Sequence, residues 1–219
     1  MRHQRVADRM TTDVVTVDAN AGFKDIVTQM SGRGTTALPV VDDTGHVLGM
    51  VTETDLLRKI EFASDPDAVP PFEPRDARAA REKAEAVTAA GLMTSPPVTI
   101  SPDAGLVDAA RLMSHHRLRR LIVTDEFGAL VGVVSRGDLL GVFSRPDSEI
   151  AAEISDHVVR RAMSIRPESI QVQVSDGIVD VRGRLARGGQ IPLMIELIHA
   201  VDGVVDVQSH LTHEEPAEP

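Results

Sequence analysis

Two short stretches of the chain pair a hydroxyl side chain with a carboxylate three residues later: Thr52 with Asp55, and Ser135 with Asp138. Each follows an apolar run, so we expect a strand that ends where a helix begins, with the acid at the surface of a cleft. Free N–H groups at a helix start attract phosphate oxygens, and a carboxylate accepts hydrogen bonds from both hydroxyls of a ribose. The same residue types also cap helices without binding a ligand, and capping remains the alternative for either stretch taken singly.

A basic segment runs from His115 to Arg120. Neighbouring histidines on a loop make a poor metal site, and no cysteine or acidic cluster accompanies them at ligand spacing. We interpret His115, His116 and Arg117 as a solvated turn. Arg119 and Arg120 differ because they directly precede an apolar, strand-like run. We expect no metal ligands and no catalytic residues, since no nucleophile and base recur together.

The composition excludes several classes of function. The 219 residues carry a formal net charge of −10 and only 2% aromatic residues, which disfavours a nucleic-acid binder. The absence of cysteine excludes disulfides, thiolate zinc sites and cysteine nucleophiles. Basic residues are mostly Arg, and we attribute the scarcity of lysine (Lys24, Lys59 and Lys83) to coding bias.

No segment approaches the roughly 20 apolar residues of a membrane-spanning helix. The first residues show no apolar stretch behind their charges, so we expect no signal peptide. The expected location is cytoplasmic, at most peripheral to a membrane.

An internal repeat organises the first two thirds of the chain. A gap-free shift of 83 positions places Met10-Thr11 on Met93-Thr94, and the stretch that ends at Asp55 on the stretch that ends at Asp138. Alternating and helical apolar spacings predict the order β-α-β-β-α in both copies. We place the repeats at residues 6–60 and 89–143.

This pattern resembles the CBS domain, and two in tandem resemble a Bateman module. The specific motif is Gly-apolar-apolar-Thr/Ser-x-x-Asp, present at 49–55 and 132–138, and a second hallmark is the run Thr36-Ala-Leu-Pro-Val-Val-Asp42. The resemblance implies an α/β (α+β) fold in which the repeats pack as a pseudo-symmetric pair. It also implies a nucleotide between the repeats and a homodimer formed through the pair.

Carried onto this sequence, the resemblance implies two unequal sites. The first, on which we place most weight, combines residues of both repeats: Thr52, Thr54, Asp55, Val98, Thr99, Arg119 and Arg120. The second and weaker site combines Thr16, Thr36, Ala37, Ser135 and Asp138.

The ligand is expected to differ between these sites. Two arginines beside a ribose-binding acid favour AMP, ADP or ATP at the first site, and magnesium ions on the phosphates are compatible with it. The second site has Thr35-Thr36-Ala37 where the other copy has Leu118-Arg119-Arg120. It is either empty or takes a less charged adenosyl ligand such as S-adenosylmethionine.

The segment between the repeats, 61–88, divides in two. Residues 61–74 contain four prolines and predict a loop, whereas residues 76–90 are rich in Ala, Arg, Glu and Lys and predict a helix.

A second, smaller domain is expected at 147–213, with the order α-β-β-α-β, before a disordered acidic tail at 214–219. Apolar residues at 150, 154, 158 and 162 predict its first helix, and Ser175-Asp176-Gly177 predicts a hairpin turn. The run Val174-x-Asp-Gly-x-Val-x-Val-x-Gly183 and the segment Ala200–Val207 resemble a BON domain. That family is associated with phospholipid surfaces and protein contacts. The apolar stretch Ile191–Ile198 is interpreted as core or a dimer face rather than a lipid anchor.

Together these features predict a non-catalytic regulator that senses an adenosine nucleotide, with the BON domain as its transmission or attachment module. The alternative is an adaptor that binds membrane phospholipid or protein through the BON domain, with the CBS pair as a dimerisation scaffold.

Overall fold

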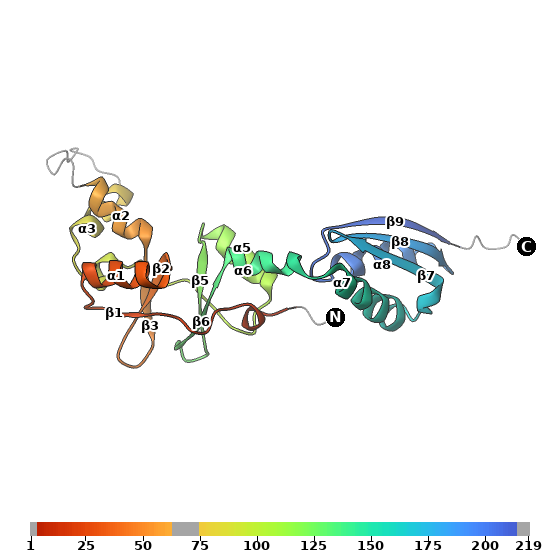
Figure 1. Cartoon of the computed structure of the whole chain (residues 1–219), viewed down its shortest axis with the longest axis horizontal. Coiled ribbons are helices and arrows are strands. Elements are labelled where there is room, and N and C mark those ends of the chain that lie inside the picture. The colour runs from red at the N-terminus through yellow and green to blue at the C-terminus, as the bar shows by residue number, and fades with distance from the viewer. Residues whose placement is uncertain (1–3, 63–74, 214–219) are drawn as a thin grey trace, which may run out of the picture. The chain divides into compact units, whose positions relative to one another are not determined.

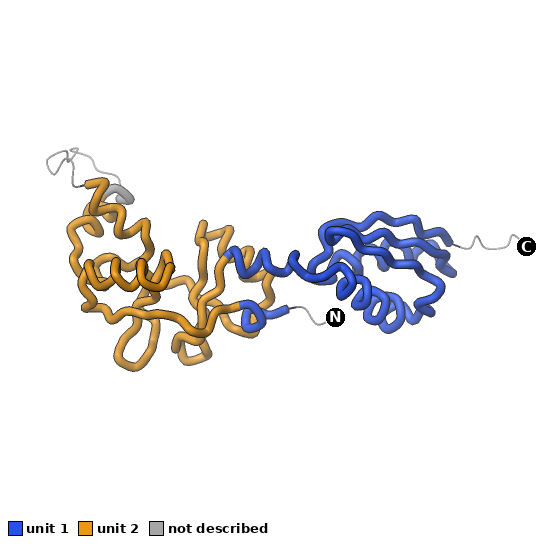
Figure 2. The backbone as a smooth tube through the Cα atoms, viewed as in Figure 1, with its two compact units in different colours: residues 1–9, 136–219 blue, residues 10–135 orange. Residues whose placement is uncertain are grey.

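The computed structural model describes residues 4–62 and 75–213 (Figure 1). The chain divides into two compact units, one of Met10–Ser135 and one of Met1–Arg9 with Arg136–Pro219 (Figure 2). The boundary falls inside the second repeat, because its last helix groups with the C-terminal domain. Most of the expected proline-rich loop and the whole acidic tail lie outside the described residues.

The first repeat has the predicted order β-α-β-β-α. Its elements are β1 (Val17–Asp18), α1 (Phe23–Arg33), β2 (Ala37–Val41), β3 (Val47–Thr52) and α2 (Glu53–Glu61). β1 pairs with β2 in parallel, and β2 pairs with β3 antiparallel. Ile26, Leu38 and Val51 are fully buried between the sheet and its helices. Burial of these aliphatic side chains is what holds so short a sheet together.

The second repeat is built in the same way. Its elements are β4 (Thr99–Ile100), α5 (Leu106–His115), β5 (Arg120–Thr124), β6 (Leu130–Ser135) and, in the other compact unit, α6 (Arg136–Leu140). The register is conserved between copies: Ala37 lies opposite Thr52, and Arg120 lies opposite Ser135. This register places the start of one strand beside the end of the next in both repeats.

The two repeats exchange short backbone pairings that obey a pseudo-twofold relation. Thr11 pairs antiparallel with Val133, and Thr94, 83 positions later, pairs with Met50. The hairpin turns contact each other in the same way: Leu130 N donates to the Gly45 carbonyl at 3.2 Å, and the Val47 N donates to the Gly128 carbonyl at 3.4 Å. The pseudo-symmetry expected from the sequence is therefore present in the backbone.

The linker helix is shorter than predicted. α3 covers Arg75–Glu85 and the short α4 covers Ala89–Leu92, in place of one helix over 76–90. The chain between them is extended because it pairs with the segment before α1. The Phe23 N–H donates to the Val87 carbonyl at 2.9 Å, and Thr88 bridges Gly22.

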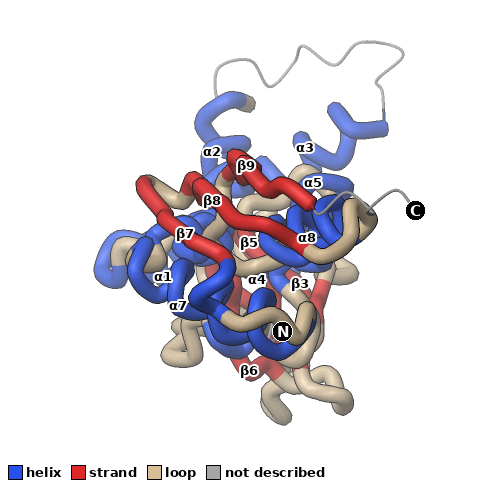
Figure 3. The backbone as a smooth tube through the Cα atoms, turned by 90° about the vertical axis from the view of Figure 1, so that its right-hand side faces the viewer, coloured by secondary structure: helices blue, strands red, loops and turns tan. Residues whose placement is uncertain are grey.

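The C-terminal unit has the predicted order α-β-β-α-β. Its elements are α7 (Asp147–Glu153), the π-helix η3 (Ile154–Ala162), β7 (Ile170–Ser175), β8 (Ile178–Leu185), α8 (Gln190–His199) and β9 (Asp206–His213). Short 3-10 turns complete it: η1 (Val6–Asp8), η2 (Gly141–Ser144) and η4 (Pro167–Ser169). The sheet order is β7-β8-β9, and Figure 3 shows its three strands in red.

The first helix of this unit departs from the expected spacing. The widening into a π-helix buries Val159 and leaves Ala162 exposed, although Ala162 follows Val158 by four residues. In a π-helix the repeat is longer than four residues per turn, so the apolar face shifts. Ile150, Ile154 and Val158 are buried as the pattern predicts.

The apolar stretch of α8 belongs to the core. Met194 and Ile198 are fully buried, and Ile191 and Leu197 pack against the same cluster. Among the described residues, no helix combines the length and apolar character needed to cross a membrane.

Candidate functional site

The strand-to-helix turn of the first repeat forms a capping box. Thr52 ends β3 with extended backbone angles, and Asp55 is the third residue of α2. Asp55 Oδ2 accepts hydrogen bonds from the Thr52 N–H at 2.9 Å and from the Thr52 hydroxyl at 2.7 Å. In the other direction the Thr52 side chain faces the Asp55 backbone N–H, and this reciprocal arrangement fixes the start of a helix. The capping alternative therefore describes this turn correctly, and it uses the same carboxylate that we expected to bind a ligand.

Asp55 is buried, with 8% of its surface exposed, where the sequence led us to expect a surface position. Its second oxygen, Oδ1, pairs with the ammonium group of Lys83 at 2.5 Å. Lys83 Nζ also donates to the Thr94 hydroxyl at 2.8 Å. One cation on the linker helix thus contacts both the first repeat, at Asp55, and the start of the second repeat, at Thr94.

A second lysine fastens the linker helix to the first repeat. Lys59 Nζ, on α2, donates to the carbonyls of Ala84 and Ala86, both at 2.9 Å. These carbonyls lie at the C-terminal end of α3, where a helix has unsatisfied acceptors and favours a cation. The same ammonium lies 5.2 Å from the centre of the Phe23 ring. Two of the three lysines in the chain therefore hold α3 in place.

Arg120 reaches from the second repeat to the first. Its guanidinium donates to the hydroxyl of Thr36, which directly precedes β2. The Thr36 carbonyl in turn accepts from the Glu53 N–H at 3.0 Å, beside the capping box. The structure thus links Arg120, expected in the first site, with Thr36, expected in the second.

The remaining members of the expected first site differ in exposure. Thr54 is exposed in the first turn of α2, Thr99 is exposed at the start of β4, and Arg119 is exposed directly before β5. Val98 is half-buried. Exposed groups at these places are free to meet a ligand without disturbing the core.

The second site is divided by the boundary between the compact units. Thr16, Thr36, Ala37 and Ser135 belong to Met10–Ser135, whereas Asp138 belongs to the other unit. Ala37 is buried at the start of β2, and Thr16 is half-buried directly before β1. Ser135 ends β6 opposite Arg120.

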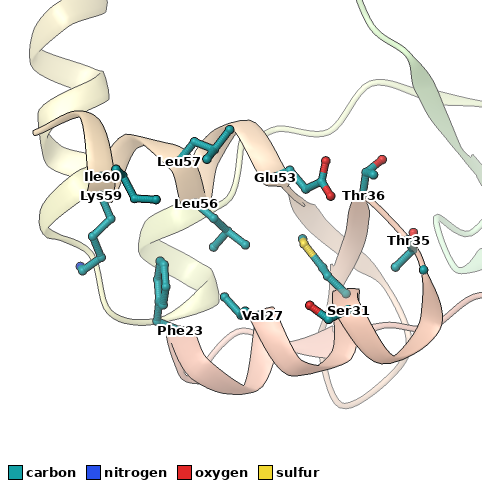
Figure 4. A pocket seen from close by; sticks show the side chains of 12 residues that line it. Phe23, Val27, Ser31, Thr35, Thr36, Glu53, Leu56, Leu57, Lys59 and Ile60 are labelled. Atoms are coloured by element: carbon teal, nitrogen blue, oxygen red, sulfur yellow. The ribbon is translucent and has the colours of Figure 1, made fainter.

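An apolar groove of about 870 Å³ lies between α1 and α2. Figure 4 shows Phe23 and Val27 of α1 pointing toward Leu56 of α2, with Glu53 and Thr36 at the other end of the groove. This groove lies on the helical face of the first repeat, and its lining does not include Asp55.

Sequence reasoning missed Lys83 and Thr94 as members of the site. The available signal was the rarity of lysine in an arginine-rich chain, which we attributed to coding bias. Lys83 lies in the insertion between the repeats, so the repeat pattern gives it no counterpart and no expected partner.

Comparison with known proteins identifies both parts of the chain. The CBS domain model matches residues 6–61 and 89–145, together more than half of the chain, and the BON domain model matches residues 146–214. The CBS domain-containing protein YhcV of Bacillus subtilis is 31% identical over 134 residues, covering 61% of this chain and 81% of that protein.

Two further matches fall on the same region. An uncharacterized protein of Methanocaldococcus jannaschii is 32% identical over 146 residues, which is 64% of this chain and only 32% of that larger protein. The crystal structure of CBSX2 in complex with AMP is 26% identical, with a TM-score of 0.54, covering 62% of this chain and 93% of that chain.

Proposed function

This chain belongs to the CBS domain family, as a tandem pair followed by a BON domain, and on that premise we propose that it is a non-catalytic sensor of an adenosine nucleotide. The observation that carries the proposal is the buried carboxylate of Asp55 at a strand-to-helix turn that is hydrogen-bonded, through Glu53, to Thr36, the residue that Arg120 of the other repeat contacts. The similarity to CBSX2, which was crystallised with AMP, supports an adenosine monophosphate unit as the common part of the ligand.

In this proposal, Asp55 accepts hydrogen bonds from the ribose hydroxyls, and Arg119 and Arg120 bind the phosphate. Arg119 is exposed, and Arg120 donates only to a neutral hydroxyl, that of Thr36, in the contact described above. A phosphate oxygen is a stronger acceptor for a guanidinium than a threonine hydroxyl, because the bond is charge-assisted on both sides. If Arg120 exchanges the Thr36 hydroxyl for a phosphate oxygen, its hydrogen bond becomes stronger, and this gain favours binding of the ligand. Thr54, Val98 and Thr99 complete the proposed first site around the adenosine.

The second site of Thr16, Thr36, Ala37, Ser135 and Asp138 remains part of the proposal as a weaker one. A single ligand per chain is expected, in the first site.

Isothermal titration of the full-length protein with AMP, ATP and S-adenosylmethionine tests the proposal. Heat is the suitable signal because the chain has no Trp and no Tyr. We expect micromolar binding of AMP or ATP at one ligand per chain. The absence of a heat of binding with all three compounds would contradict the proposal.

Two variants locate the site in the same experiment. Asp55→Asn should abolish binding of all ligands that carry a ribose, and circular dichroism should show that the variant is folded. Arg119→Gln should weaken AMP and ATP but leave S-adenosylmethionine unchanged, because only the nucleotides carry phosphate. Arg111→Gln, an exposed arginine on α5, is the matched control.

We propose the BON domain as the attachment or transmission module, with a protein partner rather than lipid. Its sheet turns a polar face away from the core: Arg182 pairs with Asp180 at 2.7 Å, and His210 lies 3.5 Å from the same carboxylate. Met194 and Ile198 of α8 are fully buried and Ile191 and Leu197 pack against the same core, which leaves Leu193, 48% exposed, as the large apolar side chain of α8 that faces outward. Flotation of the full-length protein with neutral and with anionic vesicles checks this point, and binding to either would favour the phospholipid alternative.

A further inference from the structure

Lys83 forms an ion pair with the Asp55 carboxylate, the group that is proposed to bind the ribose of the nucleotide. Asp55 Oδ2 accepts two hydrogen bonds from Thr52, and Oδ1 accepts one from Lys83. A carboxylate offers about four lone-pair positions in all. Three are filled, whereas a ribose diol needs two. The carboxylate of Asp55 therefore cannot hold both the diol and its present partners.

Lys83 is the partner that can leave. The bonds from Thr52 are local, since Thr52 and Asp55 are three residues apart on one turn, and they fix the start of α2. Lys83 is 28 residues away in sequence, on a separate helix. Its side chain is 22% exposed, so the ammonium can reach water when it leaves Asp55. The Thr94 hydroxyl, its second acceptor, is on an exposed residue.

The same contact helps to hold the linker helix. α3 packs against α2 through buried Ala84, through Lys59 at its last carbonyls and through Lys83 at Asp55. Release of Lys83 removes one of these attachments and leaves the other two. A ligand at Asp55 would thus loosen a helix that lies outside both repeats.

We propose that Lys83 is an internal latch: its ammonium takes the place of the ribose hydroxyls on Asp55, so that nucleotide binding and docking of the linker helix α3 exclude each other. This inference rests on the proposed nucleotide function and adds to it a moving element. Because linkage is reciprocal, the latch lowers the affinity for the nucleotide by the same factor by which the nucleotide weakens the latch.

The sign of one substitution tests the latch. Lys83→Met removes the ammonium and keeps the aliphatic stem. If Lys83 served the ligand, loss of a positive charge near the phosphate would weaken binding. The latch requires the opposite, a gain in AMP affinity on the order of tenfold, within the usual range of coupling between sites. Lys24→Met, which removes an exposed lysine on α1, is the matched control and should leave AMP affinity unchanged.

A second measurement uses the unaltered protein. Amide hydrogen exchange in residues 78–85 should accelerate when AMP is added to the wild type, and Lys83→Met should show the faster exchange without AMP. Equal or weaker AMP binding by Lys83→Met, or unchanged exchange in the wild type, would overturn the latch alone. Failure of AMP, ATP and S-adenosylmethionine to bind the wild type and both variants would overturn the proposed function, and the latch with it.

Discussion

Asp55 is both a structural and a candidate ligand-binding residue, and the structural part can be measured without a ligand. Its carboxylate caps α2 and neutralises Lys83 in a pair whose side chains are 11% and 22% exposed. Loss of one partner from a buried pair costs about 3–5 kcal/mol, and partial exposure reduces this figure. A substitution of Asp55 therefore changes stability as well as ligand binding, and the two effects are measured separately.

We therefore expect Asp55→Asn to lower the free energy of unfolding by about 2–3 kcal/mol, since the amide leaves Lys83 without its counter-ion. Urea unfolding followed by circular dichroism measures the change. Asp43→Asn, at an exposed position in the β2–β3 turn, should leave the unfolding free energy within about 0.5 kcal/mol of the wild type. Equal stability of both variants would show that the Lys83 contact contributes nothing.

A second carboxylate, Asp42, has a pKa set by one neighbouring hydroxyl. The Thr44 hydroxyl donates to Asp42 Oδ1 at 2.6 Å and is the main cause that lowers the pKa of Asp42, followed by the N–H groups of Thr44 and His46. The folded pKa lies below the unfolded one, so the stabilisation is complete above about pH 4 and is lost as pH falls through the folded pKa. Thr44→Val should raise the pKa of Asp42 toward its ordinary value. An NMR titration of the carboxyl carbons checks this, and an unchanged Asp42 curve would contradict it.

At the residue scale, the sequence predicted contacts between residues that are close along the chain and missed those between distant residues. Thr52 and Asp55 are three residues apart, so their meeting at a helix start follows from spacing alone. Lys83 reaches Asp55 across 28 residues through the packing of α3 on α2, which no short-range pattern encodes. Arg120 was expected near the site, but its contact with Thr36 depends on how the two repeats pack.

At the scale of elements, the glycine of the repeated motif, Gly49 or Gly132, leaves room for the backbone pairing between the two repeats. A Cβ on Gly49 would lie 2.7 Å from Met93 Sδ and 2.8 Å from the Thr94 carbonyl oxygen. Gly132 meets Met10 and Thr11 in the same way. The absence of a side chain at Gly49 and Gly132 thus lets the backbone of the other repeat come close to each strand. Both copies of the motif have this glycine because the two contacts are related by the pseudo-twofold symmetry.

Gly49→Ala should therefore destabilise the protein by about 1–3 kcal/mol, because the carbonyl oxygen cannot move aside without breaking the Met50–Thr94 pairing. Gly32→Ala is the matched control: a Cβ there meets nothing within 4 Å, and α1 gains a better helix former. That variant should be stabilised by about 0.5–1 kcal/mol. Both changes are read from urea unfolding, and the same sign for the two variants would refute the explanation.

Element order was predictable from periodicity because each strand and helix buries one apolar face. The expectation failed where a backbone contact from elsewhere decided the conformation. Residues 86–88, Ala-Val-Thr, fell within the stretch predicted as one helix, yet they are extended and pair with the segment before α1. The π-helix after α7 was not predicted, because apolar residues at intervals of four indicated an ordinary helix.

At the scale of the whole molecule, the proposed homodimer has a candidate surface on the first repeat. Leu57 is 54% exposed and Ile60 is 69% exposed on α2, beside the groove between α1 and α2. Exposed aliphatic residues gathered on one face mark an interaction surface more often than scattered ones do. The lining of the groove does not include Asp55, although Thr36, the partner of Arg120, lies at one end of it.

We expect the double substitution Leu57→Glu and Ile60→Glu to convert a dimer into a monomer, because facing copies would bury uncompensated carboxylates. Light scattering coupled to size-exclusion chromatography measures the mass. Phe127→Glu is the control, since Phe127 is 75% exposed on the β5–β6 turn, away from the groove. This variant should keep the mass of the wild type. A monomeric wild type, or dissociation caused by Phe127→Glu, would remove α1 and α2 as the interface and leave their apolar face to a different partner.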